Sequence, residues 1–359
     1  MESAERTASI KDVAELAGVA VSSVSRVLAN HPDVSSSMRD RVLAAVAATG
    51  YRPNSLARGL RSGRSMSIGF IVGDISNPLI AEIALAAERR FSNDDYTVVI
   101  ANSQGTPTRE IANIEMFQQR HVDGLLLSTS NENNAELREA ALSFPKPIVL
   151  LDRDIEGLDL PVVRFDHARG FAQAVHHLAS LGHRQLGLIA GTDGVRPTRE
   201  RVRAVRDACQ ALGLPQPEVR LGSFDPAQGS GAVHDLFSNV APPTALICGG
   251  NQILPGVIEA IRALGLRVPD DISLVTTDNS DLARFHEPPL AAIVRDAAAL
   301  GESAAALLLA AIAGEATAPI ELPTEFQEAA SCAAPTGHDE FPPRTTRRTD
   351  RSETSQHHR

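Results

Sequence analysis

A short segment near the start of the chain carries residues that could bind DNA. The residues that share one side of a helix beginning at residue 21 are Val21, Ser22, Ser25 and Arg26. Serine hydroxyls can bond phosphates or base edges, and an arginine can donate two hydrogen bonds to guanine. A free face of this kind suits a helix that enters the major groove. The pattern also fits an ordinary helical hairpin with a solvated outer face.

Two further helices must hold this face in place. Apolar residues recur at helical spacing over residues 10–17, behind Ser9, whose hydroxyl can cap a helix. Gly18 then ends this first helix, because glycine readily takes the left-handed backbone of a helix end. A third amphipathic helix follows the arginine-bearing one, capped by Ser35 and ended by Gly50. The pattern predicts a three-helix head with a sharp turn before its second helix.

Two motifs that follow the third helix identify a family. They are Tyr51-Arg-Pro-Asn54 and, after Ser55, the segment Leu56-Ala-Arg-x-Leu-Arg-x-Gly63. Together with the order of helices, they closely resemble the lactose-repressor (LacI/GalR) family of bacterial regulators. The resemblance continues more loosely to about Cys332. It implies a sequence-specific DNA-binding repressor whose operator affinity is controlled by a small ligand.

The resemblance also assigns DNA contacts residue by residue. It implies that Val21, Ser22 and Arg26 read bases, where a good bidentate pair discriminates by roughly 1–3 kcal/mol. The residues expected to contact phosphates are Ser9, Ser23, Ser25, Ser35 and Asn54. Two residues depart from the family pattern, because Ala20 replaces a capping serine and Ala29 replaces an asparagine. Each departure is expected to remove one cap or backbone contact and so to lower affinity.

Residues 54–61 match the hinge helix of the family, which also contacts DNA. Ala57 belongs to this expected contact set, and Leu60 matches the leucine that wedges into the minor groove and kinks the operator. The alternative is that Leu56 and Leu60 pack together on a neighbouring element. Gly59 departs from the pattern and costs a helix about 1 kcal/mol relative to alanine. We therefore expect this hinge to depend more than usual on DNA for its order.

Length, charge and composition agree with such a regulator. The chain has 359 residues and 43% hydrophobic residues, enough for two or three domains. Residues 1–64 carry a net charge of +3 and the remainder −13, so a mildly basic head precedes an acidic body. No apolar run approaches the roughly 20 residues of a membrane span, and the polar opening is unlike a secretory signal. A cytoplasmic protein is expected.

The rest of the chain predicts two similar α/β lobes. Apolar runs alternate with helical segments, which is typical of parallel sheets. The expected strands are residues 68–72, 97–101, 124–128 and 148–151, then 161–165, 185–190, 244–248 and 272–276. The resemblance implies a two-lobed core like that of periplasmic sugar-binding proteins, joined to the helix-turn-helix head and hinge helix.

The predicted domain boundaries follow from these patterns. They place the head and hinge at residues 1–64, the effector-binding and dimerisation core at 65–332 and a disordered tail at 333–359. Within the core, lobe one would span residues 65–164 and 295–320, and lobe two residues 165–294 and 321–332.

Polar residues after the predicted strands are the candidate effector ligands, because open parallel sheets bind ligands at the carboxyl ends of their strands. Matching positions in the family nominate Asp74, Asn77, Asp152, Arg153, Arg201, Phe224, Asn251 and Asp278. Carboxylates, amides and guanidinium can bond sugar hydroxyls, while an aromatic ring covers an apolar sugar face. Alternatively, Asp74 and Asn77 are turn residues, and Asp278 is a surface loop charge.

Departures from the family pattern leave the identity of the effector open. Ala204 and Val205 stand where glycine and an aromatic residue are common, Gln252 replaces an aspartate, and Thr276-Thr277 replaces a glycine and an aromatic residue. The chain has no tryptophan and two tyrosines, so Phe224 is the main aromatic candidate for stacking. A sugar or sugar derivative is expected, and a nucleobase or another small polar ligand remains an alternative.

Enzyme, metal and cofactor sites are not predicted. The adjacent His176 and His177 face different directions on a helix, and local spacing suggests no third metal ligand. Neither a phosphate-binding glycine loop nor a Gly-x-Ser-x-Gly nucleophile motif is present. The three cysteines, Cys209, Cys248 and Cys332, are too scattered for a metal cluster or disulfide framework, so reduced thiols are expected.

A homodimer on a palindromic DNA operator is expected from the resemblance. The Ala- and Leu-rich helix at residues 297–313 either lines the dimer interface or is buried in its own lobe. The leucine-heptad tail that tetramerises the family's namesake is absent. Two rivals remain, namely a cytosolic sugar-binding protein without regulatory DNA contact and a regulator that responds to a partner protein. Whether ligand releases or promotes DNA binding is left open.

Overall fold

The computed structural model describes residues 8–28, 32–51 and 64–336. The expected DNA contacts Asn54, Ala57 and Leu60, together with Gly59 and Ala29, lie outside these ranges. Contacts divide the chain into two units. The first comprises residues 1–76, 80–163 and 298–320, and the second comprises residues 77–79, 164–297 and 321–359. The sequence had placed these divisions at 164/165, 294/295 and 320/321.

The predicted three-helix head is present. Its helices are α1 (Ile10–Ala17), α2 (Val21–Leu28) and α3 (Ser36–Thr49). One apolar cluster joins them, made of Val13, Ala14, Ala17, Val24, Val27, Val42 and Ala45. Both predicted helix-ending glycines, Gly18 and Gly50, adopt the left-handed conformation with φ of 63°. The helices therefore end where the sequence indicated, and the apolar stripe of each faces a common core.

Five parallel strands form the sheet of the first unit. They are β1 (Ser67–Val72), β2 (Thr97–Asn102), β3 (Gly124–Leu127), β4 (Ile148–Leu151) and β5 (Val162–Asp166). The last three residues of β5 belong to the second unit. Their order is β2-β1-β3-β4-β5, so β2 is an edge strand. The central strands are buried on both faces, which explains their continuous apolar sequences.

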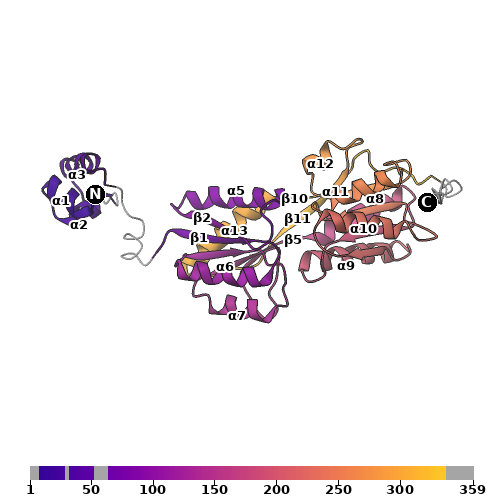
Figure 1. Ribbon diagram of the computed structural model, residues 1–359, viewed down its shortest axis with the longest axis horizontal. Helices are drawn as coiled ribbons and strands as arrows, with labels where there is room; N and C mark the ends of the chain where they lie inside the picture. The colour runs from indigo at the N-terminus through magenta and orange to yellow at the C-terminus, as the bar shows by residue number, and fades with distance from the viewer. Residues whose placement is uncertain (1–7, 29–31, 52–63, 337–359) are drawn as a thin grey trace, which may run out of the picture. The chain divides into compact units, whose positions relative to one another are not determined.

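Helices cover both faces of this sheet (Figure 1). They are α5 (Pro78–Ser92), α6 (Pro107–Gln119), α7 (Ala135–Ser143) and α13 (Ala297–Ala313). α6 and α7 pack on one face through Ile114, Phe117 and Leu137, and α5 and α13 cover the other (Figure 1). Of the two readings of α13, burial is the one seen here, because Leu300 and Leu308 are fully buried.

The second unit repeats this three-layer arrangement. Its strands are β6 (Leu186–Ala190), β7 (Glu218–Leu221), β8 (Ala245–Gly249), β9 (Ser273–Thr277), β10 (Ala291–Arg295) and β11 (Ile320–Gln327). The order is β11-β10-β9-β8-β6-β7, with β11 antiparallel to β10 and the other observed pairings parallel. In each unit the second strand, β2 or β7, is an edge strand that pairs with the first, β1 or β6. This is the arrangement expected for a repeated βαβ unit.

Two helix pairs enclose the second sheet. α8 (His167–Ser180) and α9 (Arg196–Ala211) cover one face, and α10 (Pro226–Leu236) and α11 (Leu254–Ala263) cover the other. The short α12 (Asp281–Arg284) follows β9. The backbones of α10 and α11 approach closely at Gly256. A Cβ at this position would lie 1.7 Å from the carbonyl oxygen of Pro226, so only glycine fits there.

The chain beyond residue 332 continues along the second unit. Buried His183 lies 2.9 Å through Nε2 from the carbonyl oxygen of Ala333 and 2.8 Å through Nδ1 from the hydroxyl of Thr244. Thr336 donates to the carbonyl oxygen of Asp270 at 3.1 Å. Burial lowers the pKa of His183. Residues 333–336 are therefore held in place, whereas residues 337–359 lie outside the described ranges.

Within the described part of the chain, no helix combines the length and hydrophobicity that a membrane crossing requires.

Candidate functional site

Helix α2 presents the face that the sequence nominated for DNA. Val24 and Val27 are buried in the head, so the opposite side must face outward. Ser22 and Arg26 are exposed, and Val21 is 37% exposed. An aliphatic group, a hydroxyl and a guanidinium thus lie together on one helix face, which is the chemistry needed to contact base edges in a groove.

Serines nominated as phosphate contacts lie at the ends and sides of these helices. Ser9 and Ser35 precede α1 and α3 and are exposed, while Ser23 and Ser25 are half-buried on α2. The hydroxyl of Ser9 donates to the carboxylate of Asp12 at 2.8 Å. The hydroxyl of Ser35 instead accepts the amide of Met38 at 3.4 Å. Helix N-termini favour anions, so both serines lie where a phosphate could be bound.

Arg201 is buried at the carboxyl end of β8. It comes from α9 and is 3% exposed, and its Nη1 donates to the carbonyl oxygen of Gly249 at 2.6 Å. Its Nε donates to Nδ1 of His167 at 3.4 Å, and its guanidinium lies 5.8 Å from the ring centre of Phe171. A buried cation needs such partners to offset its lost hydration. They hold the guanidinium rigidly at the strand end.

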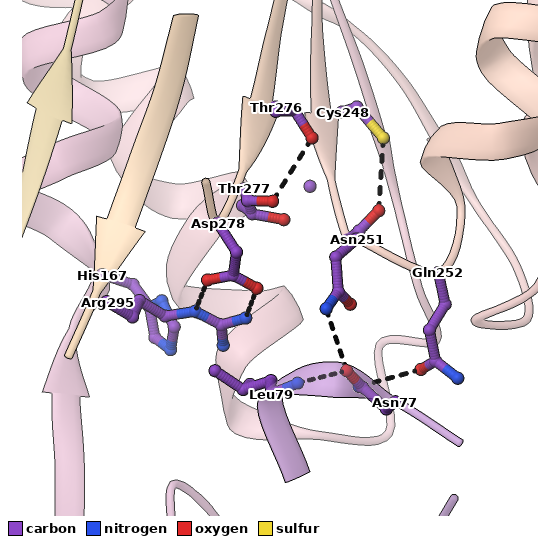
Figure 2. A network of polar contacts seen from close by, with 12 residues as sticks. Asn77, Leu79, His167, Cys248, Asn251, Gln252, Thr276, Thr277, Asp278 and Arg295 are labelled. Atoms are coloured by element: carbon purple, nitrogen blue, oxygen red, sulfur yellow. Dashed lines mark hydrogen bonds and ion pairs between the residues drawn. The ribbon is translucent and has the colours of Figure 1, made fainter. Parts of the chain in front are cut away.

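Asp278 forms a largely shielded, part-buried ion pair that the sequence did not reveal. Its two carboxylate oxygens accept from Nε and Nη2 of Arg295 at 2.8 and 2.6 Å (Figure 2). The side chains are 13% and 7% exposed. Asp278 is therefore not a surface loop charge. Because Arg295 occupies both oxygens, Asp278 is less open to ligand hydroxyls than its family position implied.

A cluster of three amides lies beside this pair (Figure 2). Asn77 accepts the side-chain amide of Asn251 at 2.8 Å and donates to Gln252 at 3.2 Å. Its Oδ1 also accepts the backbone amide of Leu79 at 3.0 Å, at the start of α5. Asn77 is thus a turn residue, which was the alternative interpretation of it. It also contacts Asn251, another residue expected to bind the effector. Residues 77–79 belong to the second unit, as Asn251 and Gln252 do.

Phe224 packs over glycines at the ends of β6 and β8. A Cβ on Gly191 would lie 2.1 Å from the ring, and one on Gly250 would lie 3.3 Å from it. The ring can approach the backbone this closely because both positions lack a side chain. Phe224 is half-buried, so part of its surface remains accessible for stacking.

The candidate residues of the first unit also lie at strand ends. Asp152 follows β4, is 6% exposed and has a left-handed backbone with φ of 50°. Arg153 donates through Nε to the carbonyl oxygen of Thr129 at 2.9 Å. Asp74 accepts the amide and hydroxyl of Ser76 at 2.9 and 2.8 Å, which is a turn contact.

The structure therefore brings the candidates together in groups. Asn77 and Asn251 meet beside β8. Asp152 and Arg153 are neighbours in the sequence, and Arg153 donates to the backbone carbonyl oxygen of Asp152. Arg295, the last residue of β10, was missed because β10 had not been among the predicted strands. A correct strand prediction there would have been the signal for it. Where side chains are described, no group of three potential metal ligands is found.

Comparisons with known proteins decide the family. A model for bacterial regulatory proteins of the lacI family matches residues 9–54, and one for a periplasmic binding protein-like domain matches residues 175–332. The HTH-type transcriptional repressor CytR of Escherichia coli (strain K12) is 32% identical over 314 residues, covering 87% of this chain and 92% of that protein. The chain belongs to the LacI family.

Two solved structures, of the lac repressor and of another transcriptional regulator, share the fold. The lac repressor dimer bound to operator and the anti-inducer ONPF superposes with a TM-score of 0.83 at 26% identity, covering 92% of this chain and 100% of that chain. A complex of the transcriptional regulator CelR with cellobiose has a TM-score of 0.68 at 26% identity, covering 90% and 99%. This LacI-family chain is therefore a DNA-binding transcriptional regulator of the repressor type and not an enzyme.

Proposed function

We propose that this protein is a cytoplasmic homodimer that represses transcription from a palindromic operator, and that a sugar or sugar derivative controls its operator affinity. The observation that carries the DNA part is the exposed face of α2, with Val21, Ser22 and Arg26 outward and Val24 and Val27 buried. The lac repressor relative is a dimer bound to operator, which supports the same assembly here.

The residues that we propose for effector binding are strand-end residues, taken here unit by unit. Arg201, Asn251 and Phe224 supply a buried guanidinium, an amide and an aromatic surface. Asp152 and Arg153 supply further polar groups in the first unit. This chemistry suits a ligand with several hydroxyls and one apolar face. The CelR relative, which binds cellobiose, supports a carbohydrate.

Selection of bound sequences from a random DNA pool tests the operator-binding part. We expect wild-type protein to enrich a palindrome with a kinkable central step. Arg26→Ala should relax the preference at one base pair of each half-site, while Leu60→Ala should blur the centre. Arg41→Ala, an exposed change on α3, is the control and should leave the motif intact. The proposal fails if wild-type protein enriches nothing both without ligand and with a panel of monosaccharides, disaccharides and nucleosides present.

A ligand panel tests the effector. Any ligand that binds only the folded protein raises its melting temperature as its concentration increases. We expect one carbohydrate to do so, and Arg201→Met to abolish the response. If a free nucleobase alone raises the melting temperature, the proposed effector class is wrong.

We further propose that the edge strand β2 contributes to the dimer. Its Val99 and Ile100 are 37% and 40% exposed, and an apolar edge strand is suited to pairing with another copy. Ile100→Arg should give monomers in analytical ultracentrifugation. Leu142→Arg, at a 66% exposed position on α7, should leave the dimer intact. A dimeric Ile100→Arg protein would place the interface elsewhere.

A further inference from the structure

A buried carboxylate holds the chain where it enters the first unit. Asp123 immediately precedes β3 and is 3% exposed. Its Oδ1 accepts the backbone amide of Ser65 and its Oδ2 that of Met66, both at 2.9 Å. The register of β1 with β2 begins only at Ser67, so the carboxylate extends the bonding of this segment by two residues.

The backbone that Asp123 holds has an unfavourable conformation. Met66 has a φ of 54°, which is uncommon for a residue other than glycine, asparagine or aspartate. Such a conformation persists only where surrounding contacts impose it. Here the contacts are the carboxylate of Asp123 and the bond from the amide of Thr97 to the carbonyl oxygen of Met66 at 3.0 Å. Together they turn the chain at residues 65–66.

The surroundings strengthen these bonds. Tyr96 lies nearby and is 6% exposed. Its pKa is raised mainly by burial, then by the charge of Asp123, and lowered by Arg64. A carboxylate in such a poorly hydrated place makes stronger hydrogen bonds than one in water. Asp123 is therefore a firm anchor and not a solvent-exposed charge.

The position of this anchor along the sequence connects it to operator binding. Residues 52–64 join the head to Ser65, so the anchor sets the point from which the head is tethered. From Asp123 the chain passes through β3 and reaches Thr129, a span of about 20 Å if the whole segment is extended. The carbonyl oxygen of Thr129 accepts a hydrogen bond from Arg153, a residue proposed to bind the effector. The four residues of β3 are fully buried, which makes the strand a stiff connection.

We propose that Asp123 is a positioning residue for operator binding, which fixes residues 65–66 and so ties the tether of the DNA-binding head to β3. This inference rests on the proposed function. It adds a residue that contacts neither DNA nor ligand. Without the two hydrogen bonds from Asp123, residues 65–66 would have to become ordered each time the protein binds its operator. Ordering each residue costs conformational entropy. Operator affinity should therefore fall although every DNA-contacting residue is intact.

Asp123→Asn is the first variant to measure. An amide has one oxygen, so one of the two backbone amides would face an NH2 group instead of an acceptor. We expect folded Asp123→Asn protein to bind the selected operator at least tenfold more weakly than wild type. The salt dependence of binding should be unchanged, because the phosphate contacts are the same. Asp271→Asn is the matched control, because Asp271 also accepts a backbone amide, at 2.8 Å from Arg267, but on the second unit.

A second pair of variants tests the anchor even if Asp123→Asn does not fold. Met66→Gly frees the turn, whereas Met66→Asn keeps a residue that tolerates the left-handed conformation. We expect weaker operator binding from Met66→Gly and near wild-type binding from Met66→Asn. Operator binding by folded Asp123→Asn within twofold of wild type, or equal binding by both Met66 variants, overturns the inference. Failure of wild-type protein to bind any operator would instead count against the proposed function.

Discussion

Replacing Arg295 with methionine should destabilise the second unit by removing one partner of a part-buried ion pair. The guanidinium and carboxylate meet through two hydrogen bonds of 2.8 and 2.6 Å, and the side chains are only 7% and 13% exposed. Water can therefore reach the carboxylate of Asp278 only in part once its partner is removed. Breaking a pair of this kind costs about 3–5 kcal/mol, because a charge is left buried without compensation.

A double substitution separates the ion pair from simple packing. Arg295→Met with Asp278→Asn removes both charges, so most of the lost stability should return. We expect the double variant to be about 2 kcal/mol more stable than Arg295→Met alone, since an amide is far cheaper to bury than a charge. Asp278→Asn alone should also destabilise, because it removes the anion that accepts two hydrogen bonds from Arg295.

Urea unfolding followed by circular dichroism is the suitable assay, because the chain has no tryptophan for fluorescence. The two units can unfold separately, so each transition is fitted with its own midpoint and slope. The reasoning is refuted if Arg295→Met costs less than about 1 kcal/mol, or if the double variant is no more stable than Arg295→Met. Either result would mean that the pair is effectively solvated.

Three further predictions concern stability and reactivity. Burial lowers the pKa of His183 below its ordinary value of 6.5. The unfolded chain therefore takes up a proton more readily than the folded one, and stability should fall as pH drops below about 6.5. In urea titrations at several pH values, His183→Gln should make stability less dependent on pH. Burial raises the pKa of Cys248 to about 12, so iodoacetamide at pH 8 should label it only after unfolding, as mass spectrometry would show. Gly256→Ala should lower stability by about 3 kcal/mol or more, because its Cβ would overlap the carbonyl oxygen of Pro226. Gly231→Ala, with open space around it, should be neutral or stabilising in the same melts.

The sequence predicted the helices and strands correctly where the local pattern of apolar residues matches their burial in the folded protein. The apolar runs at residues 68–72 and 148–151 are β1 and β4, because only buried parallel strands tolerate such continuous apolar sequence. Gly18 and Gly50 end their helices in the left-handed conformation that was expected of them. β7, β10 and β11 were not predicted. Polar Glu218 and Arg220 interrupt β7, and only its neighbours in the sheet make it a strand.

The candidate sites were harder to predict because side chains choose partners that are distant in sequence. The position of Asp278 after a strand was correctly recognised, but its partner Arg295 lies 17 residues away. Asn77 was weighed as either a turn residue or a ligand, and its contacts with Leu79 and Asn251 show that one amide can have both neighbours. Asp123 had no motif at all, since its role depends on backbone amides 57 and 58 residues earlier.

The placement of α13 has a consequence for the order in which the chain is made. α13 contributes Leu308 and Ile312 against Gly124 of β3, and its Gly301 lies against the backbone of Ile83 on α5. A nascent chain therefore cannot complete the core of its first unit until residue 313 has left the ribosome. Until then one face of β3 lacks its cover, while the second unit up to β10 has already been synthesised. Premature termination before residue 297 should yield an aggregation-prone fragment and not a smaller working regulator.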